Sequence, residues 1–130
     1  MSFGNDGKLH AIGWLLRNTV PMTISSQLIA LWNGNPGSFL VTGTEVAGNN
    51  YSRVPTGPGD WLEPSSGTAT NGSAIVFPEC QTADWGLVDY IVICNQVGFP
   101  LFYGPLTTAK TITVGSIPRF DVGDLVVTLV

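Results

Sequence analysis

The segment from Gly43 to Pro55, GTEVAGNNYSRVP, places one carboxylate, one phenol and one guanidinium close together in the chain. Glu45, Tyr51 and Arg53 could together hold a polar ligand by hydrogen bonds and charge. A second interpretation is purely structural: Gly48-Asn49-Asn50 turns the backbone through positive φ angles, Tyr51 packs inward, and Glu45 approaches Arg53 across the turn. We predict this structural corner, and a surface ion pair of this kind contributes only about 0–1 kcal/mol.

Catalytic chemistry has few candidates in this chain. His10 is the only histidine; it lies in a candidate helix, and no G-x-S-x-G motif accompanies it. One histidine and two separated cysteines do not provide the ligand set of a metal site. The chain also lacks the glycine spacing of phosphate-binding loops. We therefore predict no catalytic, cofactor-binding or metal-binding residues.

Two pairs of carboxylates keep an enzymatic alternative open, because glycosidases act with paired acids. Glu79 and Asp84 form one pair, and Asp60 and Glu63 form the other. Asp84, however, directly precedes Trp85 and is typical of a turn acid that bonds its own backbone, with the tryptophan entering the core. No general base with a partner can be named. We expect a protein that is not an enzyme.

The composition predicts one domain over residues 1–130. Charged residues make up 11% of the chain, the net charge is −4, and the five lysines and arginines are scattered. This pattern disfavours nucleic-acid and membrane-surface partners, which require basic patches. Cys80 and Cys94 fit a protein made in a reducing cytosol, and a disulfide between them is a second possibility. Cys94 ends an apolar run and is a candidate core residue.

Residues 1–20 are expected to form a helical arm. Asp6 can cap the helix, apolar residues recur at helical spacing through KLHAIGWLLRN, and Asn18 and then Pro21 end it. A helix with one apolar side must dock, either on its own sheet or on a neighbouring subunit. Its candidate interface residues are Leu9, Ile12, Trp14 and Leu16.

Residues 21–130 predict an all-β, compact antiparallel β-sandwich of about seven or eight short strands, following the one short N-terminal helix. The run from Tyr90 to Cys94 is apolar throughout, which is typical of a strand buried on both faces. Residues 55–72 are rich in Pro, Gly, Ser and Thr and predict a long ordered loop, in which Trp61 and Leu62 are further interface candidates. The candidate strands are SQLIALWN, SFLVTGTEV, SAIVFP, WGLVDYIVICN, PLFYGPL, KTITVG and DLVVTLV, the last of which runs to Val130.

Five stretches in a fixed order resemble a family of small tailed-bacteriophage virion proteins, often labelled tail-fibre proteins. No one of these motifs is specific alone, but together they cover nearly the whole chain in the same order. The stretches are QLIALWNGNPG, GTEVAGNNYSRV, AIVFPECQTADWGLVDYIVI, PLFYGPLTTAKTITVG and GDLVVTLV.

The resemblance implies a structural protein of the virion, assembled in the host cytoplasm. Because the chain has no repeats and no long coiled coil from which to build a fibre shaft, we expect a capsid decoration or cement protein that binds and stabilises the phage head. The expected form is a homo-oligomer, preferably a trimer, and the expected partners are the major capsid protein or tail proteins. The alternative is a tail- or neck-associated fibre-type module, whose host-glycan contacts would centre on Trp61, Asp60 and Glu63.

Overall fold

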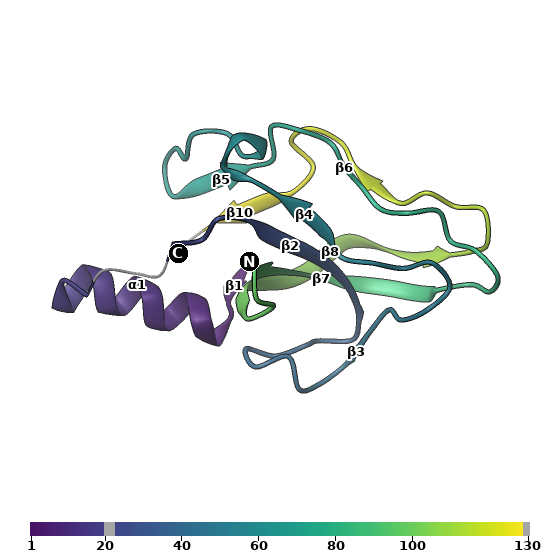
Figure 1. Ribbon diagram of the computed structural model, residues 1–130, viewed down its shortest axis with the longest axis horizontal. Coiled ribbons are helices and arrows are strands. Elements are labelled where there is room, and N and C mark those ends of the chain that lie inside the picture. The colour runs from purple at the N-terminus through teal and green to yellow at the C-terminus, as the bar shows by residue number, and fades with distance from the viewer. Residues whose placement is uncertain (20–22, 129–130) are drawn as a thin grey trace.

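A computed structural model describes residues 1–19 and 23–128 of the chain (Figure 1). All strand pairs in these residues are antiparallel, and the strands form one large sheet with two short strand pairs stacked on it. The expected antiparallel β-sandwich with one short N-terminal helix is therefore confirmed. The large sheet contains β1 (Ser2–Phe3), β8 (Pro100–Ile112), β7 (Gly86–Asn95), β2 (Gln27–Asn33), β3 (Thr44–Glu45) and β4 (Val54–Thr56).

β2 and β7 form the centre of this sheet because both are almost continuously apolar. They pair over six positions, including Ile29 opposite Ile93. Alternate side chains point to opposite faces of a sheet, so Ile91 and Ile93 join the main core while Val92 and Cys94 join a smaller cluster on the other face. All four side chains are at most 2% exposed, which confirms the predicted double burial.

The second layer of the sandwich consists of two strand pairs, which lie over the large sheet in Figure 1. β5 (Thr68–Thr70) pairs with β10 (Val126–Thr128), and β6 (Ile75–Val76) pairs with β9 (Arg119–Phe120). The buried Asn71 joins the segments between them: its amide group donates to the carbonyls of Ser73 and Asp121 and accepts from the Leu125 amide, each at 2.9 Å. Phe77, which is 1% exposed, fills the space between the layers.

Several predicted boundaries are wrong in detail. PLFYGPL and KTITVG are not separate strands, because β8 runs on to Ile112 before the chain turns. Residues 55–72 are not a loop throughout, since they contain the end of β4, a 3₁₀ turn at Pro58–Asp60 and β5. In SFLVTGTEV only β3 is a strand. The described residues hold ten strands, where about seven or eight were expected. The excess consists of very short strands, and a strand of two residues leaves no periodic pattern that a sequence can reveal.

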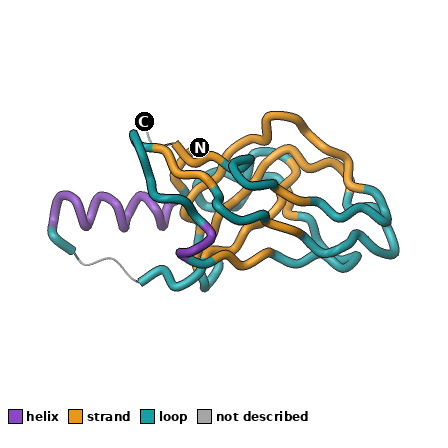
Figure 2. Tube along the Cα trace, turned by 90° about the horizontal axis from the view of Figure 1, so that it is seen from above, coloured by secondary structure: helices purple, strands orange, loops and turns teal. Residues whose placement is uncertain are grey.

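The helix α1 (Asn5–Arg17) projects from one end of the sandwich (Figures 1 and 2). Gly4, and not Asp6, occupies the N-cap position, and the helix ends where Asn18 adopts a left-handed conformation at φ 52°. The predicted stop at Pro21 and the predicted strand end at Val130 lie outside the described residues. Across the described residues, no helix is both long and apolar enough to cross a membrane.

Candidate assembly surfaces

The base of α1 is fixed to the large sheet. β1 pairs with β8 just before the helix, and the rings of Phe3 and Phe102 stack with centroids 5.1 Å apart. The Gly4 amide donates to the Leu101 carbonyl at 2.8 Å. Gly7 is buried against that carbonyl so closely that a Cβ atom at this position would overlap it. The first turn of the helix is therefore held rigidly, and the direction in which the helix points is set by the sheet.

Asp6 strengthens this attachment from the side. The fully buried Asn95 accepts hydrogen bonds from the amides of Val97, Gly98 and Phe99 and donates to Asp6 Oδ2 at 3.2 Å. Asp6 therefore joins the helix to the turn after β7, where sequence reasoning assigned it to capping. His10 lies one helical turn further on, with Nε2 3.1 Å from Asp6 Oδ2.

Beyond its base, α1 exposes its apolar side chains. Leu9, Ile12 and Leu16 lie on one face at helical spacing, Trp14 lies on another, and Leu15 adds to the apolar surface. Their exposed fractions are 64% for Leu9, 56% for Ile12, 59% for Trp14, 73% for Leu15 and 79% for Leu16. The helix is therefore not buried in its own sandwich, which was one of the two outcomes the sequence left open. Leu15 is an exposed residue that the sequence analysis did not include.

An apolar groove of about 550 Å³ lies at the end of the sandwich from which α1 projects. Leu101 and Phe102, which also hold the helix base, form one wall, and Trp61 and Leu62 form part of another. Leu62 is 53% exposed, whereas the indole of Trp61 is turned inward and donates to Thr56 Oγ1 at 3.2 Å. The structure thus brings the two groups of predicted interface residues, those of the helix and those of the loop, to the same end of the molecule.

The Gly43–Pro55 corner lies on the far edge of β2 and interrupts its partner strand. β3 and β4 both pair with β2, and the residues between them leave the ladder. The Tyr51 hydroxyl fills the gap: it accepts the Leu31 amide at 3.0 Å and donates to Glu45 Oε1 at 3.1 Å. The phenol thereby replaces a backbone carbonyl of the missing strand pairing, which explains why a tyrosine occupies this position.

Glu45 and Arg53 form a bidentate pair beside this hydroxyl. Arg53 Nε lies 2.8 Å from Glu45 Oε1, and Nη2 lies 2.9 Å from Oε2. Arg53 is 27% exposed and Glu45 23%, so the predicted pair forms across the turn and is partly buried rather than fully exposed. Removing one member of a partly buried bidentate pair costs more than removing one member of an exposed pair, because the other charge is left without its partner and with less water around it.

The turn of the corner follows the prediction and docks on a second loop. Gly48, Asn49 and Asn50 have φ angles of 71°, 53° and 71°. The Trp85 indole donates to the Asn49 carbonyl at 2.9 Å, and its ring meets that of Tyr51 edge to face at 5.3 Å. Trp85 thus joins the corner, whereas Asp84 turns away from it and accepts the Val114 amide at 2.9 Å.

Burial shapes the ionisation of this corner. The pKa of Tyr51 is raised, first because the phenol is desolvated and also because Glu45 lies beside it. Arg53 has a raised pKa because of its hydrogen bonds to Glu45. Burial raises the pKa of Cys94 to about 11, although the neighbouring Arg53 favours its thiolate. Cys80 and Cys94 are both free and buried, so the possible disulfide is not formed.

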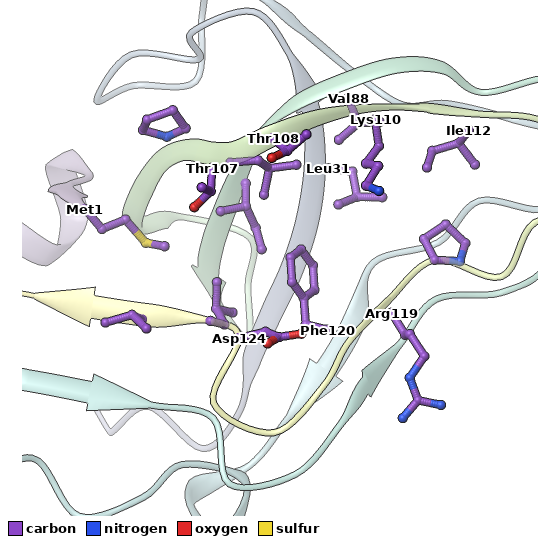
Figure 3. A pocket seen from close by; sticks show the side chains of 16 residues that line it. Met1, Leu31, Val88, Thr107, Thr108, Lys110, Ile112, Arg119, Phe120 and Asp124 are labelled. Atoms are coloured by element: carbon purple, nitrogen blue, oxygen red, sulfur yellow. The ribbon is translucent and has the colours of Figure 1, made fainter.

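A second cavity, of about 540 Å³, opens between the two layers near β9 (Figure 3). Val88, Lys110, Ile112, Phe120 and Asp124 are among the side chains that line it. Arg119 also lines the cavity and is held by Asp121 at 2.7 Å. Sequence reasoning missed this cavity, because its lining comes from segments far apart in the chain. Among the described residues, no cluster of three or more metal-ligating side chains occurs.

These features describe a small β-sandwich module with a projecting helix whose large apolar side chains are exposed. The polar side chains of its Gly43–Pro55 corner form hydrogen bonds within the protein. The family model described as "Podophage GP4 fiber I protein gp80" matches residues 7–128, so the chain belongs to this family of phage fibre-type structural proteins. The match confirms that the chain belongs to a phage fibre-type family, as its motifs indicated. No curated protein matches the chain significantly.

Proposed function

We propose that this chain is a non-enzymatic, fibre-type structural subunit of a phage virion, which acts by binding neighbouring virion subunits through α1. The observation that carries the proposal is the row of large apolar side chains on a helix whose base is rigidly held. Full burial of one such side chain stabilises a complex by roughly 1.5–3 kcal/mol. A pre-oriented helix also loses little conformational freedom on binding, so more of that energy appears as affinity.

The family match favours a fibre-type location over the head-decoration role expected from the sequence. The compact sandwich suits a module at the base or the tip of an appendage, because it carries no shaft of its own within the described residues. A capsid decoration protein would use the same helix with the major capsid protein as its partner. In either place we propose a homo-oligomer, with a trimer preferred because closed cyclic oligomers match symmetric sites.

The test is a phage that encodes the chain with Leu9, Ile12 and Leu16 all changed to serine. Purified particles are analysed by quantitative mass spectrometry for the amount of the chain, and by cryo-electron microscopy for its position. We expect the parent chain on the tail or its appendages and at least a tenfold loss of the variant. Val114→Asp, which alters an exposed apolar residue outside the helix and the groove, is the control. Full incorporation of the serine variant, or absence of the parent chain from particles, would contradict the proposal.

A further inference from the structure

We infer that the partner of α1 is a second copy of this chain, whose apolar groove receives the helix. The inference rests on the proposed structural function and names the contact that would make the homo-oligomer. Each copy has both halves of this contact at the same end of the molecule: the exposed residues Leu9, Ile12 and Leu16 on one face of α1, and the groove lined by Trp61, Leu62, Leu101 and Phe102.

The groove and the helix match in character and size. The groove is lined mainly by apolar residues, and a cleft of about 550 Å³ lies in the range that accepts several apolar groups at once. A helix that enters a groove by residues spaced one turn apart is a common mode of recognition. The exposure of Trp14 and Leu16 shows that the helix does not fill the groove of its own chain. Its rigid base at Gly4 and Gly7 directs it away from the sandwich (Figure 1).

Charge also favours a second copy over an unrelated surface. Two of the five basic residues of the chain, Lys8 and Arg17, lie on α1, and the groove carries the carboxylate of Glu63. Neither Arg17 nor Glu63 forms a salt bridge within the described part of the chain. A positively charged helix tip and an acidic groove edge attract each other and orient the encounter.

A helix-into-groove contact of this kind is heterologous, because each copy gives its helix to one neighbour and its groove to the other. Such contacts generate closed rings when the rotation between copies closes. A stable interface needs roughly 800 Å² from each partner. In a closed ring, the helix of each copy, about 20 Å long, enters the groove of one neighbour, and its own groove receives the helix of the other neighbour. Every helix and every groove in the ring is then occupied.

The experiment measures the oligomeric state of the full chain by analytical ultracentrifugation and native mass spectrometry. The parent should be oligomeric at micromolar concentration. Leu16→Asp in the helix and Leu62→Asp in the groove should each give monomers, with unchanged circular dichroism, while Val114→Asp remains oligomeric. When the two defective variants are mixed, each mixed pair still has one intact helix and one intact groove. The mixture should therefore form a one-to-one dimer.

Alternative outcomes are clear. A monomeric parent overturns the inference, as does a Leu62→Asp protein that remains as oligomeric as the parent, because helices would then pair with each other. Failure of the two variants to form the mixed dimer would also overturn the inference. Arg17→Glu and Glu63→Arg should each weaken association about two- to fivefold, and the double variant should restore it. These measurements need no phage particle, so they can fail while the virion test of the proposed function succeeds, and the reverse.

Discussion

The corner at Gly43–Pro55 and the helix α1 invert the usual meaning of polar and apolar residues. The corner holds the polar side chains that could bind a ligand, but these side chains form hydrogen bonds with one another or with the backbone: Tyr51 with Leu31, and Arg53 with Glu45. On α1, in contrast, the large apolar side chains, which are typical of a protein core, are exposed to solvent. A polar cluster is therefore a candidate site only while its donors and acceptors lack partners within the protein. An apolar face becomes a candidate when its own fold leaves it open.

The largest effect is expected when the tyrosine of the corner is removed. Tyr51→Ala leaves the Leu31 amide without its acceptor and opens space beside Phe77 and Trp85. We expect the free energy of unfolding to fall by about 3–5 kcal/mol in urea titrations. Tyr51→Phe, the matched control, keeps the ring and should cost only about 1–2 kcal/mol. Equal losses for the two variants would show that the hydroxyl, and not the ring, accounts for the stability of the corner.

Alkaline pH should weaken the corner while leaving the exposed apolar face of the helix unaffected. Burial raises the pKa of Cys94 from 9.0 to about 11, and that of Tyr51 above its value of 10.0. Both groups bind protons more tightly in the folded state, so their contribution is complete below about pH 9 and is lost as pH rises toward the folded values. The free energy of unfolding, measured by urea titration, should fall by roughly 2 kcal/mol between about pH 9 and 11. Cys94→Ala combined with Tyr51→Phe should flatten this decline; an unchanged slope would exclude these groups as its cause.

Arg53→Ala should give a smaller loss. It removes the bidentate partner of Glu45, but both side chains keep some contact with water, so we expect the protein to fold with about 1–2 kcal/mol less stability. Thermal unfolding followed by circular dichroism measures the change. Arg119→Ala, which removes a far more exposed pair with Asp121, provides the comparison and should cost less than about 0.5 kcal/mol. If the two variants lose the same stability, partial burial adds nothing to the corner pair.

The smallest effect on stability is expected on the helix. Ile12→Ser changes a side chain that is 56% exposed and should alter the free energy of unfolding of the isolated subunit by less than about 0.5 kcal/mol. Measurements belong in the monomeric Leu16→Asp background, where any oligomer contact is already absent. Ile29→Ser in the fully buried centre of β2 is the contrast, with an expected loss above about 3 kcal/mol. A large loss for Ile12→Ser would mean that the helix packs on its own subunit after all.

The strands that sequence reasoning located are those with long apolar runs. β2 and β7 could be predicted because they are covered on both faces, and such runs need no alternation. β1 and β9 were not predicted, since two residues carry no period, whereas β3 and β6 are the short paired parts of the longer candidate strands SFLVTGTEV and SAIVFP. The turn at Gly48-Asn49-Asn50 was predictable because only glycine and asparagine adopt positive φ angles readily, and that preference is local. The cavity around Phe120 was not, because its walls come from separate strands.

By itself, the sequence determined the β-rich class, the central strands, the helix and the left-handed turn. Each depends on short-range patterns or on backbone preferences of single residues. Only the tertiary structure decided that Glu45 and Arg53 are partly buried, that Tyr51 substitutes for a strand carbonyl, and that α1 remains uncovered. The physical reason is that an apolar helix face indicates that the face is to be buried, but does not indicate which surface will pack on it. That cover depends on the direction in which Gly4, Gly7 and Asp6 fix the helix on β8 and on the turn after β7.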